Sequence, residues 1–186
     1  ALLGDKRLLF ADGDRAFLMY GVEGRSWIAL GDPVGPDHES VELAWRFREL
    51  ADRHEGLCAF YQVQARNLPL YVDLGLTLMK LGEEGRVPLA DFSLTGGARK
   101  SLRQGIRHLA AEGWTFRVAE PTEVAARMEE LRCVSDAWLA EKHTREKGFS
   151  LSSFSPDYLR RFPAALVERH GEIAAFANVW PGGGKD

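Results

Sequence analysis

The chain has 186 residues, of which 45% are hydrophobic and 27% charged, and its formal net charge is -3. This composition is typical of a globular protein with one sizeable domain or two small lobes. It offers no stretch near the roughly 20 apolar residues of a membrane-spanning helix. Because the chain is mildly acidic, any site for a polyanion must be local rather than a property of the whole surface.

Antiparallel strands are predicted for the first 30 residues. Aromatic and β-branched runs alternate there with turns rich in Gly and Asp, which is the pattern of hairpins. The segment 31–36, GDPVGP, ends the run because its two prolines cannot continue a ladder. This loop either lines a substrate cleft, with Asp32 as an orienting carboxylate, or simply closes a hairpin.

The next elements are a helix and further strands. Apolar residues recur at helical spacing over 38–55, and Gly56 stands where a C-terminal cap belongs. The continuous apolar run at 57–63 predicts a central strand buried on both faces. Residues 76–82 predict another strand, and 87–92, which contain a proline, predict an edge strand or a loop.

The order of elements then restarts near residue 114. A strand is predicted at 114–120, followed by a long helix from Pro121 to about Lys142. Ser155 opens another short helix, and a hairpin is predicted over 164–180. At the end of that hairpin, Asn178 and Trp180 either face a ligand or form an ordinary strand end.

The segment 96–112 predicts a helix with two neighbouring stripes. An apolar stripe, expected to face the core, consists of Leu102, Ile106 and Leu109. A basic stripe consists of Arg99, Lys100, Arg103 and Arg107. No carboxylate occurs in the segment before Glu112.

Local energetics oppose the basic stripe. Like charges four residues apart destabilise a helix by about 0.2–0.5 kcal/mol per pair. Cations in the first turn cost roughly 0.3–1 kcal/mol each through the helix dipole. A bound anion reverses both effects, and backbone N–H groups near Gly96 and Gly97 could join the cations around a phosphate. The alternative is a solvated basic face, or pairing with Glu83, Glu84 or Asp91.

Other site chemistries find little support. The five histidines have no ligand spacing, so a metal site is not expected. Neither a GxSxG motif nor a P-loop or GxGxxG pattern is present. Cys58 and Cys133 are far apart in unlike contexts, and we expect two free, buried thiols in a reducing compartment rather than a disulfide.

Five ordered blocks, spread from about residue 5 to 180, carry a family resemblance. They are AFLMYGVEGRSWIALGDPVGP, FYQVQARNLPLYVDLGLTLMKLGEE, TGGARKSLRQGIRHLAAEG, SDAWLAEKHTREKGFSLSSFSPDYLRRFP and EIAAFANVW. Together they resemble the soluble synthase domain of the multiple peptide resistance factor family, the aminoacyl-phosphatidylglycerol synthases. The resemblance implies an α/β fold of tandem acetyltransferase-like (GNAT-like) lobes with mixed, largely antiparallel sheets. The first lobe would span 1–113, and 114–186 would begin a second, incomplete lobe.

The resemblance also implies an activity. Family members transfer an aminoacyl group, lysyl or alanyl, from aminoacyl-tRNA to phosphatidylglycerol, without a metal or cofactor. The domain lies at the cytoplasmic face of the bacterial plasma membrane, attached to a flippase domain, and the product gives resistance to cationic antimicrobial peptides. The resemblance carries the basic stripe over as the candidate contact with tRNA or lipid phosphate.

The catalytic residues stay unassigned, because the sequence stops at PGGGKD, where the family's second lobe should continue. Two other functions remain open. One is a coenzyme A-dependent N-acetyltransferase, although the segment 64–71, after the predicted central strand, lacks the glycines of a pyrophosphate loop. The other is a non-catalytic module that binds RNA or anionic lipid.

Overall fold

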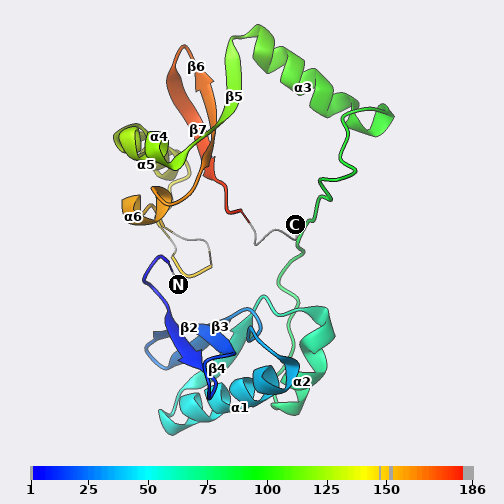
Figure 1. The fold of residues 1–186 in the computed structure, drawn as a ribbon, viewed down its shortest axis with the longest axis vertical. Helices are drawn as coiled ribbons and strands as arrows, with labels where there is room; N and C mark the ends of the chain where they lie inside the picture. Colours follow the sequence, from blue (N-terminus) through cyan, green and yellow to red (C-terminus); the bar gives the residue numbers. More distant parts are fainter. Residues whose placement is uncertain (1, 147, 151–152, 182–186) are drawn as a thin grey trace. The chain divides into compact units, whose positions relative to one another are not determined.

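The computed structural model describes residues 2–146, 148–150 and 153–181 (Figure 1). Its contacts divide the chain into an N-terminal unit, Ala1–Gly82 with Lys147–Ser152, and a C-terminal unit, Glu83–Glu146 with Ser153–Asp186. The basic helix therefore groups with the strands that follow it. A lobe boundary at residue 113 stays a prediction.

The N-terminal unit is built on a four-stranded sheet of order β1-β2-β3-β4. Strands β1 (Arg7–Phe10), β2 (Phe17–Glu23) and β3 (Ser26–Leu30) are antiparallel, as predicted. Helix α1 (Asp37–Arg53) then crosses to β4 (Leu57–Tyr61), which runs parallel to β3. The sheet is therefore mixed and largely antiparallel.

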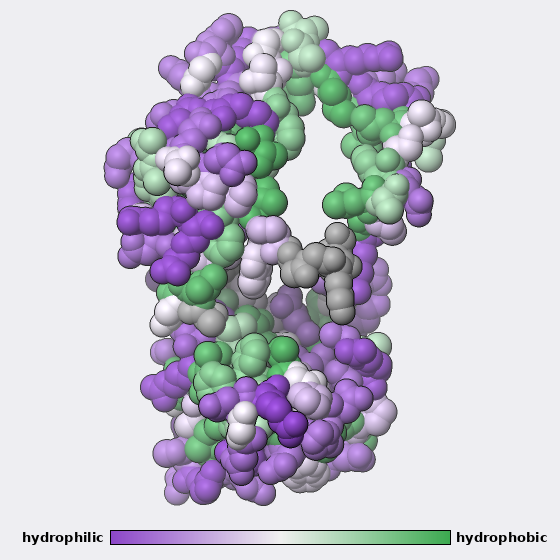
Figure 2. All heavy atoms as spheres, viewed as in Figure 1, coloured by the Kyte–Doolittle hydropathy of each residue, from purple (hydrophilic) through white to green (hydrophobic). Residues whose placement is uncertain are grey.

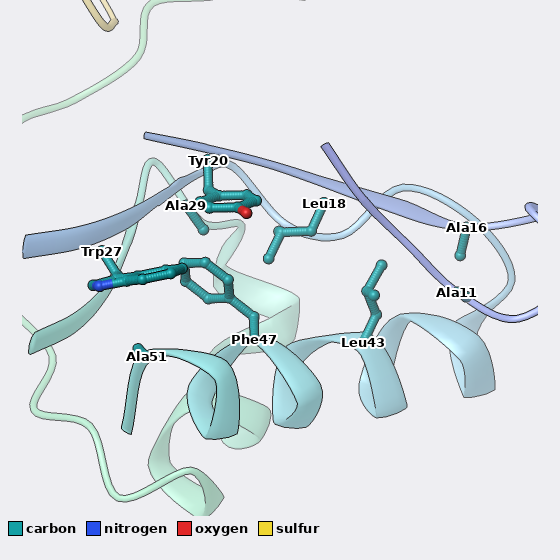
Figure 3. Close-up of a cluster of buried hydrophobic side chains, with 9 residues drawn as sticks. All are labelled: Ala11, Ala16, Leu18, Tyr20, Trp27, Ala29, Leu43, Phe47 and Ala51. Carbon is teal, nitrogen blue, oxygen red and sulfur yellow. The ribbon is translucent and has the colours of Figure 1, made fainter. Parts of the chain in front are cut away.

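One face of α1 forms the core of this unit (Figure 3). Leu43, Phe47 and Ala51 recur at helical spacing, and all three are fully buried. They meet alternate residues of the sheet, among them Tyr20 and Trp27, whose rings stack with centroids 5.8 Å apart. The aromatic contacts fix the helix on the sheet.

A second, smaller hydrophobic cluster joins α1 to the segment after β4. The short helices η1 (Ala65–Asn67) and α2 (Leu68–Asp73) follow β4. Tyr71 and Leu74 pack there against Ala44 of α1. This cluster fixes the segment after β4 against the helix.

Two predictions for this unit are wrong. The run 57–63 was expected to be a central strand, but in the described part of the chain β4 is an edge of the sheet, and Leu57 is 65% exposed. Residues 76–82 form no strand. Both segments have apolar side chains of strand character, but in the described part of the chain β4 pairs with β3 alone, and no strand pairs with 76–82.

The C-terminal unit begins with η2 (Gly97–Arg99) and α3 (Lys100–Ala111). Strands β5 (Trp114–Ala119), β6 (Ala164–Arg169) and β7 (Glu172–Asn178) then form an antiparallel sheet in that order. Helices α4 (Pro121–Ala126), α5 (Met128–Glu141) and α6 (Pro156–Leu159) lie on one face of it (Figure 1). Val124, Leu131 and Leu159 bury that face.

The long helix predicted from Pro121 to about Lys142 is interrupted. Arg127 has φ -105° and ψ 22°, which ends α4 before α5 begins. Its guanidinium donates hydrogen bonds to Glu168 and to the carbonyl of Gly171, both on the β6–β7 hairpin. The break therefore lies where the helical segment is tied to the sheet.

Candidate functional site at helix α3

Helix α3 begins without a capping side chain. Gly96 has φ 86°, in the left-handed region that glycine adopts without strain, and it turns the chain into η2. Neither Gly96 nor Arg99 supplies a side-chain hydrogen bond to the first turn. The backbone N–H groups at this end of the helix therefore have no capping side chain as acceptor. The N-terminus of a helix binds anions favourably through such groups.

The apolar stripe is not buried. Leu102 is 46% exposed, Ile106 54% and Leu109 47%. Figure 2 shows green and purple residues on opposite sides of this helix, so its amphipathic character is plain at the surface. The expectation that this stripe faces a core is wrong for the described residues, because no described element covers it.

Three members of the basic stripe have no carboxylate partner among the described residues. Lys100 and Arg107 are exposed and have no ion pair there. The Arg99 guanidinium lies 5.3 Å from the centroid of the Phe92 ring. The alternative of pairing with Glu84 is excluded, since Glu84 lies 3.0 Å from Arg86.

Arg103 has a different task. Its Nη1 donates to the carbonyl of Gly96 at 2.7 Å and also to that of Leu94. These bonds hold the turn before η2 against the helix. Glu112, the first carboxylate after the stripe, lies 3.0 Å from His108. Arg103 thus stabilises the turn before the helix. The other three cations of the basic stripe are available to bind an external anion.

The Asp32 carboxylate connects two segments of the N-terminal unit through hydrogen bonds. Its Oδ1 accepts a hydrogen bond from Tyr71 Oη at 2.6 Å, and its Oδ2 accepts one from the Gln64 N–H at 2.9 Å. Burial and this carboxylate raise the pKa of Tyr71. Asp32 therefore joins the loop after β3 to the segment after β4, and its role as an orienting carboxylate in a cleft stays a prediction.

Asn178 ends β7, opposite Ala164 in the ladder, and it is exposed. Its side chain has no hydrogen-bond partner among the residues described. The structure brings the four cations of the basic stripe together, with Arg99 at the end of η2 and the other three on α3. It places Asp32 in the N-terminal unit, among the residues that follow β3 and β4.

The sequence analysis missed an ionic network on the helix-covered face of the C-terminal sheet. Glu168 is 7% exposed, and it accepts hydrogen bonds from Arg117 Nε at 2.6 Å and from Arg127 Nη1. The two arginines also bind Glu123 and Glu130, respectively. The hydrogen bond from Arg117 lowers the pKa of Glu168 to about 2, against the opposing effect of burial.

A signal for this network was present in the sequence. Arg117 and Glu168 occupy positions at which strand alternation points the side chain toward the buried face. A charged residue at such a position needs a partner. The network anchors α4 and α5 to the sheet and offers no free group for chemistry.

Other site types are absent from the described residues. None of their His, Cys, Asp and Glu side chains cluster in groups of three or more that could hold a metal ion. Among the same residues, no helix is both long and apolar enough to cross a bilayer. Cys58 and Cys133 are free thiols, but the expectation that both are buried is wrong, because Cys58 is only partly buried and Cys133 is exposed.

These features define a mixed α/β domain of the acetyltransferase-like class with a basic helix at its surface, and comparison with solved structures confirms that class. The chain matches, with a TM-score of 0.88 and 45% identity, the C-terminal domain of a putative lysylphosphatidylglycerol synthetase from Agrobacterium fabrum. It matches L-PGS from Bacillus licheniformis with a TM-score of 0.87 and 38% identity. The matches cover 95% and 97% of this chain but 56% and 57% of those chains.

Sequence comparison gives the family. The model of the family described as "Phosphatidylglycerol lysyltransferase, C-terminal" matches residues 1–186, and the chain belongs to this family. It is 40% identical to the phosphatidylglycerol lysyltransferase of Bacillus subtilis (strain 168) and 32% identical to that of Staphylococcus aureus (strain COL). Each match covers 96% of this chain and 21% of the relative, so the chain spans about a fifth of their length.

Proposed function

We propose that this chain is part of an enzyme that transfers an aminoacyl group, lysyl or alanyl, from aminoacyl-tRNA to phosphatidylglycerol. The observation that carries the proposal is the basic stripe of α3 in a chain of this family. Lys100 and Arg107 have no carboxylate partner among the described residues, and both substrates carry phosphates. The stripe holds phosphate groups of one of these substrates.

The reaction is a transesterification. A hydroxyl of the lipid glycerol attacks the carbonyl of the aminoacyl ester, the bond to the ribose oxygen breaks, and the proton passes to that oxygen. The ester is already activated, so the chief tasks of the protein are to position two polyanions and to stabilise the developing oxyanion. The basic stripe contributes to the first task by binding the phosphate groups of one of the two polyanions.

The rest of the proposal concerns the whole enzyme. The domain works at the cytoplasmic face of the bacterial plasma membrane, attached to a membrane flippase domain of the same polypeptide. Adding a lysyl group reverses the charge of the lipid head group, and adding an alanyl group neutralises it. A membrane with fewer negative charges attracts cationic antimicrobial peptides less strongly, which gives resistance.

A coenzyme A-dependent reaction at the N-terminal unit is disfavoured. The segment after β4, residues 64–71, contains no glycine. The N–H of Gln64 at its start already donates to the carboxylate of Asp32 at 2.9 Å. A pyrophosphate bound at this helix start would meet that negative charge and lose that donor.

The test is lipid aminoacylation by the full gene product with tRNA charged with labelled lysine, and in parallel with alanine. We expect label in phosphatidylglycerol, and at least a roughly tenfold fall in kcat/KM for the triple variant Arg99→Gln, Lys100→Gln, Arg107→Gln, since charge-assisted contacts contribute about 1.5–3 kcal/mol each. The control variant Arg86→Gln removes an exposed cation of the loop before η2 and should act like the wild type.

Two results would refute the proposal. One is lipid labelling that continues at the same rate after ribonuclease has destroyed the tRNA. The other is the absence of lipid product together with micromolar binding of acetyl-CoA, measured by isothermal titration.

A further inference from the structure

We propose that α3 is a membrane-surface helix, which inserts its apolar stripe into an anionic bilayer while its cations contact lipid phosphates. This inference rests on the proposed function, since it assigns the basic stripe to the lipid substrate rather than to the tRNA. Three observations carry it: the exposure of the apolar stripe, the lack of local carboxylates, and the orientation of one stripe beside the other.

The apolar stripe is a surface of the helix that can enter a bilayer. Leu102, Ile106 and Leu109 are each about half exposed, although they form a continuous row on a single face. A water-exposed row of this kind marks a surface that becomes covered in use. Helices that lie in the plane of a membrane bury such a row at the boundary between head groups and acyl chains.

The basic stripe identifies what covers the apolar one. Arg99, Lys100 and Arg107 have no carboxylate partner in the described part of the chain, and they border the apolar residues along one side. A polypeptide covering this face would have to supply several carboxylates at matched positions. An anionic lipid surface supplies phosphates at every position, and membrane-surface helices carry Lys and Arg on the polar face for this reason.

The contacts of Arg103 fit the same view. Arg103 fixes the turn at 94–96 through its carbonyls, so the start of the helix keeps its shape when the neighbouring cations bind. A domain acting on phosphatidylglycerol has to reach the lipid surface, and α3 provides a surface contact.

The test uses vesicles of phosphatidylglycerol and phosphatidylcholine in a flotation assay with the chain alone, without tRNA. We expect binding that requires phosphatidylglycerol and weakens as salt rises. The double variant Leu102→Asn, Ile106→Asn should bind at least about tenfold less, as expected for losing a buried apolar side chain. Each cation replaced by Gln, at positions 99, 100 or 107, should reduce binding about fivefold.

Matched controls remove an exposed apolar or basic residue elsewhere. Val41→Asn changes a half-exposed residue of α1, and Arg86→Gln removes the same charge as each α3 variant. Both should bind vesicles like the wild type. Equal losses in the control and α3 variants, or full binding by the double variant, would overturn the inference.

Hydrogen exchange on the unmodified protein provides a measurement that does not depend on variants. Phosphatidylglycerol vesicles should slow amide exchange in 100–111, and phosphatidylcholine vesicles should not. In the full gene product, exchange of this segment that is already slow and unaffected by vesicles would place polypeptide on the stripe and overturn the inference. Loss of tRNA affinity in the triple cation variant, with vesicle binding unchanged, would assign the stripe to RNA and also overturn it.

The inference and the proposed function fail separately. Vesicle binding that depends on α3, without any aminoacyl transfer by the full gene product, refutes the proposed function alone. Transfer activity with no vesicle binding by α3 refutes the membrane inference alone.

Discussion

Replacing Glu168 with glutamine removes a carboxylate shared by two arginines. Arg117 donates to it from Nε at 2.6 Å and from Nη2 at 3.1 Å, and Arg127 donates from Nη1. Glu168 is 7% exposed, so water replaces none of these bonds in the folded state. The variant leaves two partly buried guanidinium groups with less negative charge around them, and we expect the C-terminal unit to lose stability.

The magnitude follows from the pKa of Glu168, which the Arg117 hydrogen bond lowers from 4.5 to about 2. At 1.36 kcal/mol per pKa unit, this shift corresponds to at most about 3–4 kcal/mol. Because Arg117 is 38% exposed and screened by water, we expect about 2 kcal/mol. The folded pKa is the lower one, so this stability is fully present above about pH 4.5 and is lost as the pH falls toward 2.

The assay is urea unfolding between pH 6 and pH 2, followed by hydrogen exchange of β6 peptides, which reports on the C-terminal unit separately. The wild type should lose about 2 kcal/mol of unfolding free energy across this range through Glu168, in addition to losses from other carboxylates. The Glu168→Gln variant should start about 2 kcal/mol lower at pH 6 and lose correspondingly less on acidification.

A matched control is Glu129→Gln, which changes an exposed carboxylate in the first turn of α5 and should stay within about 0.5 kcal/mol of the wild type. An acid dependence of Glu168→Gln parallel to that of the wild type would refute the reasoning. It would mean that Glu168 does not bind its proton differently in the folded and unfolded states.

Three further measurements test individual contacts and the burial of single side chains. Gly56→Ala should lower the free energy of unfolding in urea by about 1–3 kcal/mol, because its Cβ would lie 2.3 Å from Trp27 Cδ1. The control Gly82→Ala places a Cβ that meets no atom within 4 Å, and equal stability of the two variants would contradict the packing. Tyr71→Phe should cost about 1–2 kcal/mol, since it removes the 2.6 Å bond to Asp32, and an unchanged unfolding midpoint would show that bond to be unimportant. Iodoacetamide at pH 8 should modify Cys133 before Cys58, because burial raises the pKa of Cys58 to about 11. Equal modification rates of the two thiols, measured by mass spectrometry, would contradict this expectation.

The elements that the sequence predicted correctly are those whose signal is local. Gly and Asp turns between apolar runs specify the hairpins of β1 to β3 and of β6 and β7. Helical spacing of apolar residues specifies α1 and α3 within a few residues of their observed ends. In each case the pattern needs no knowledge of what the element packs against.

The wrong predictions depend on distant partners. Whether the apolar run of β4 is central or at an edge is decided by a neighbouring strand, and whether 76–82 pairs at all is decided in the same way. Gly56 was interpreted as a helix cap, but Glu55, with φ 53°, is the left-handed residue after α1. Gly56 instead leaves room for the Trp27 ring, a contact that the sequence does not reveal.

The same distinction between local signals and distant contacts applies to the candidate site. Spacing alone places the cations on adjacent turns, since helix geometry is fixed, and three of them lie on α3 with Arg99 directly before it. The separate task of Arg103 could not be predicted, because it depends on carbonyls that a particular turn brings within reach. The same holds for Glu168, whose partners come from β5 and from the break between α4 and α5.

The energetics of α3 connect the fold to both proposals. Like charges along one face and cations in the first turn each oppose the helix, and the half-exposed apolar stripe adds a cost of contact with water. A soluble anion relieves only the first two costs, and an apolar protein surface relieves only the third. An anionic bilayer relieves all three at once, because its phosphates face the cations while its acyl chains receive Leu102, Ile106 and Leu109.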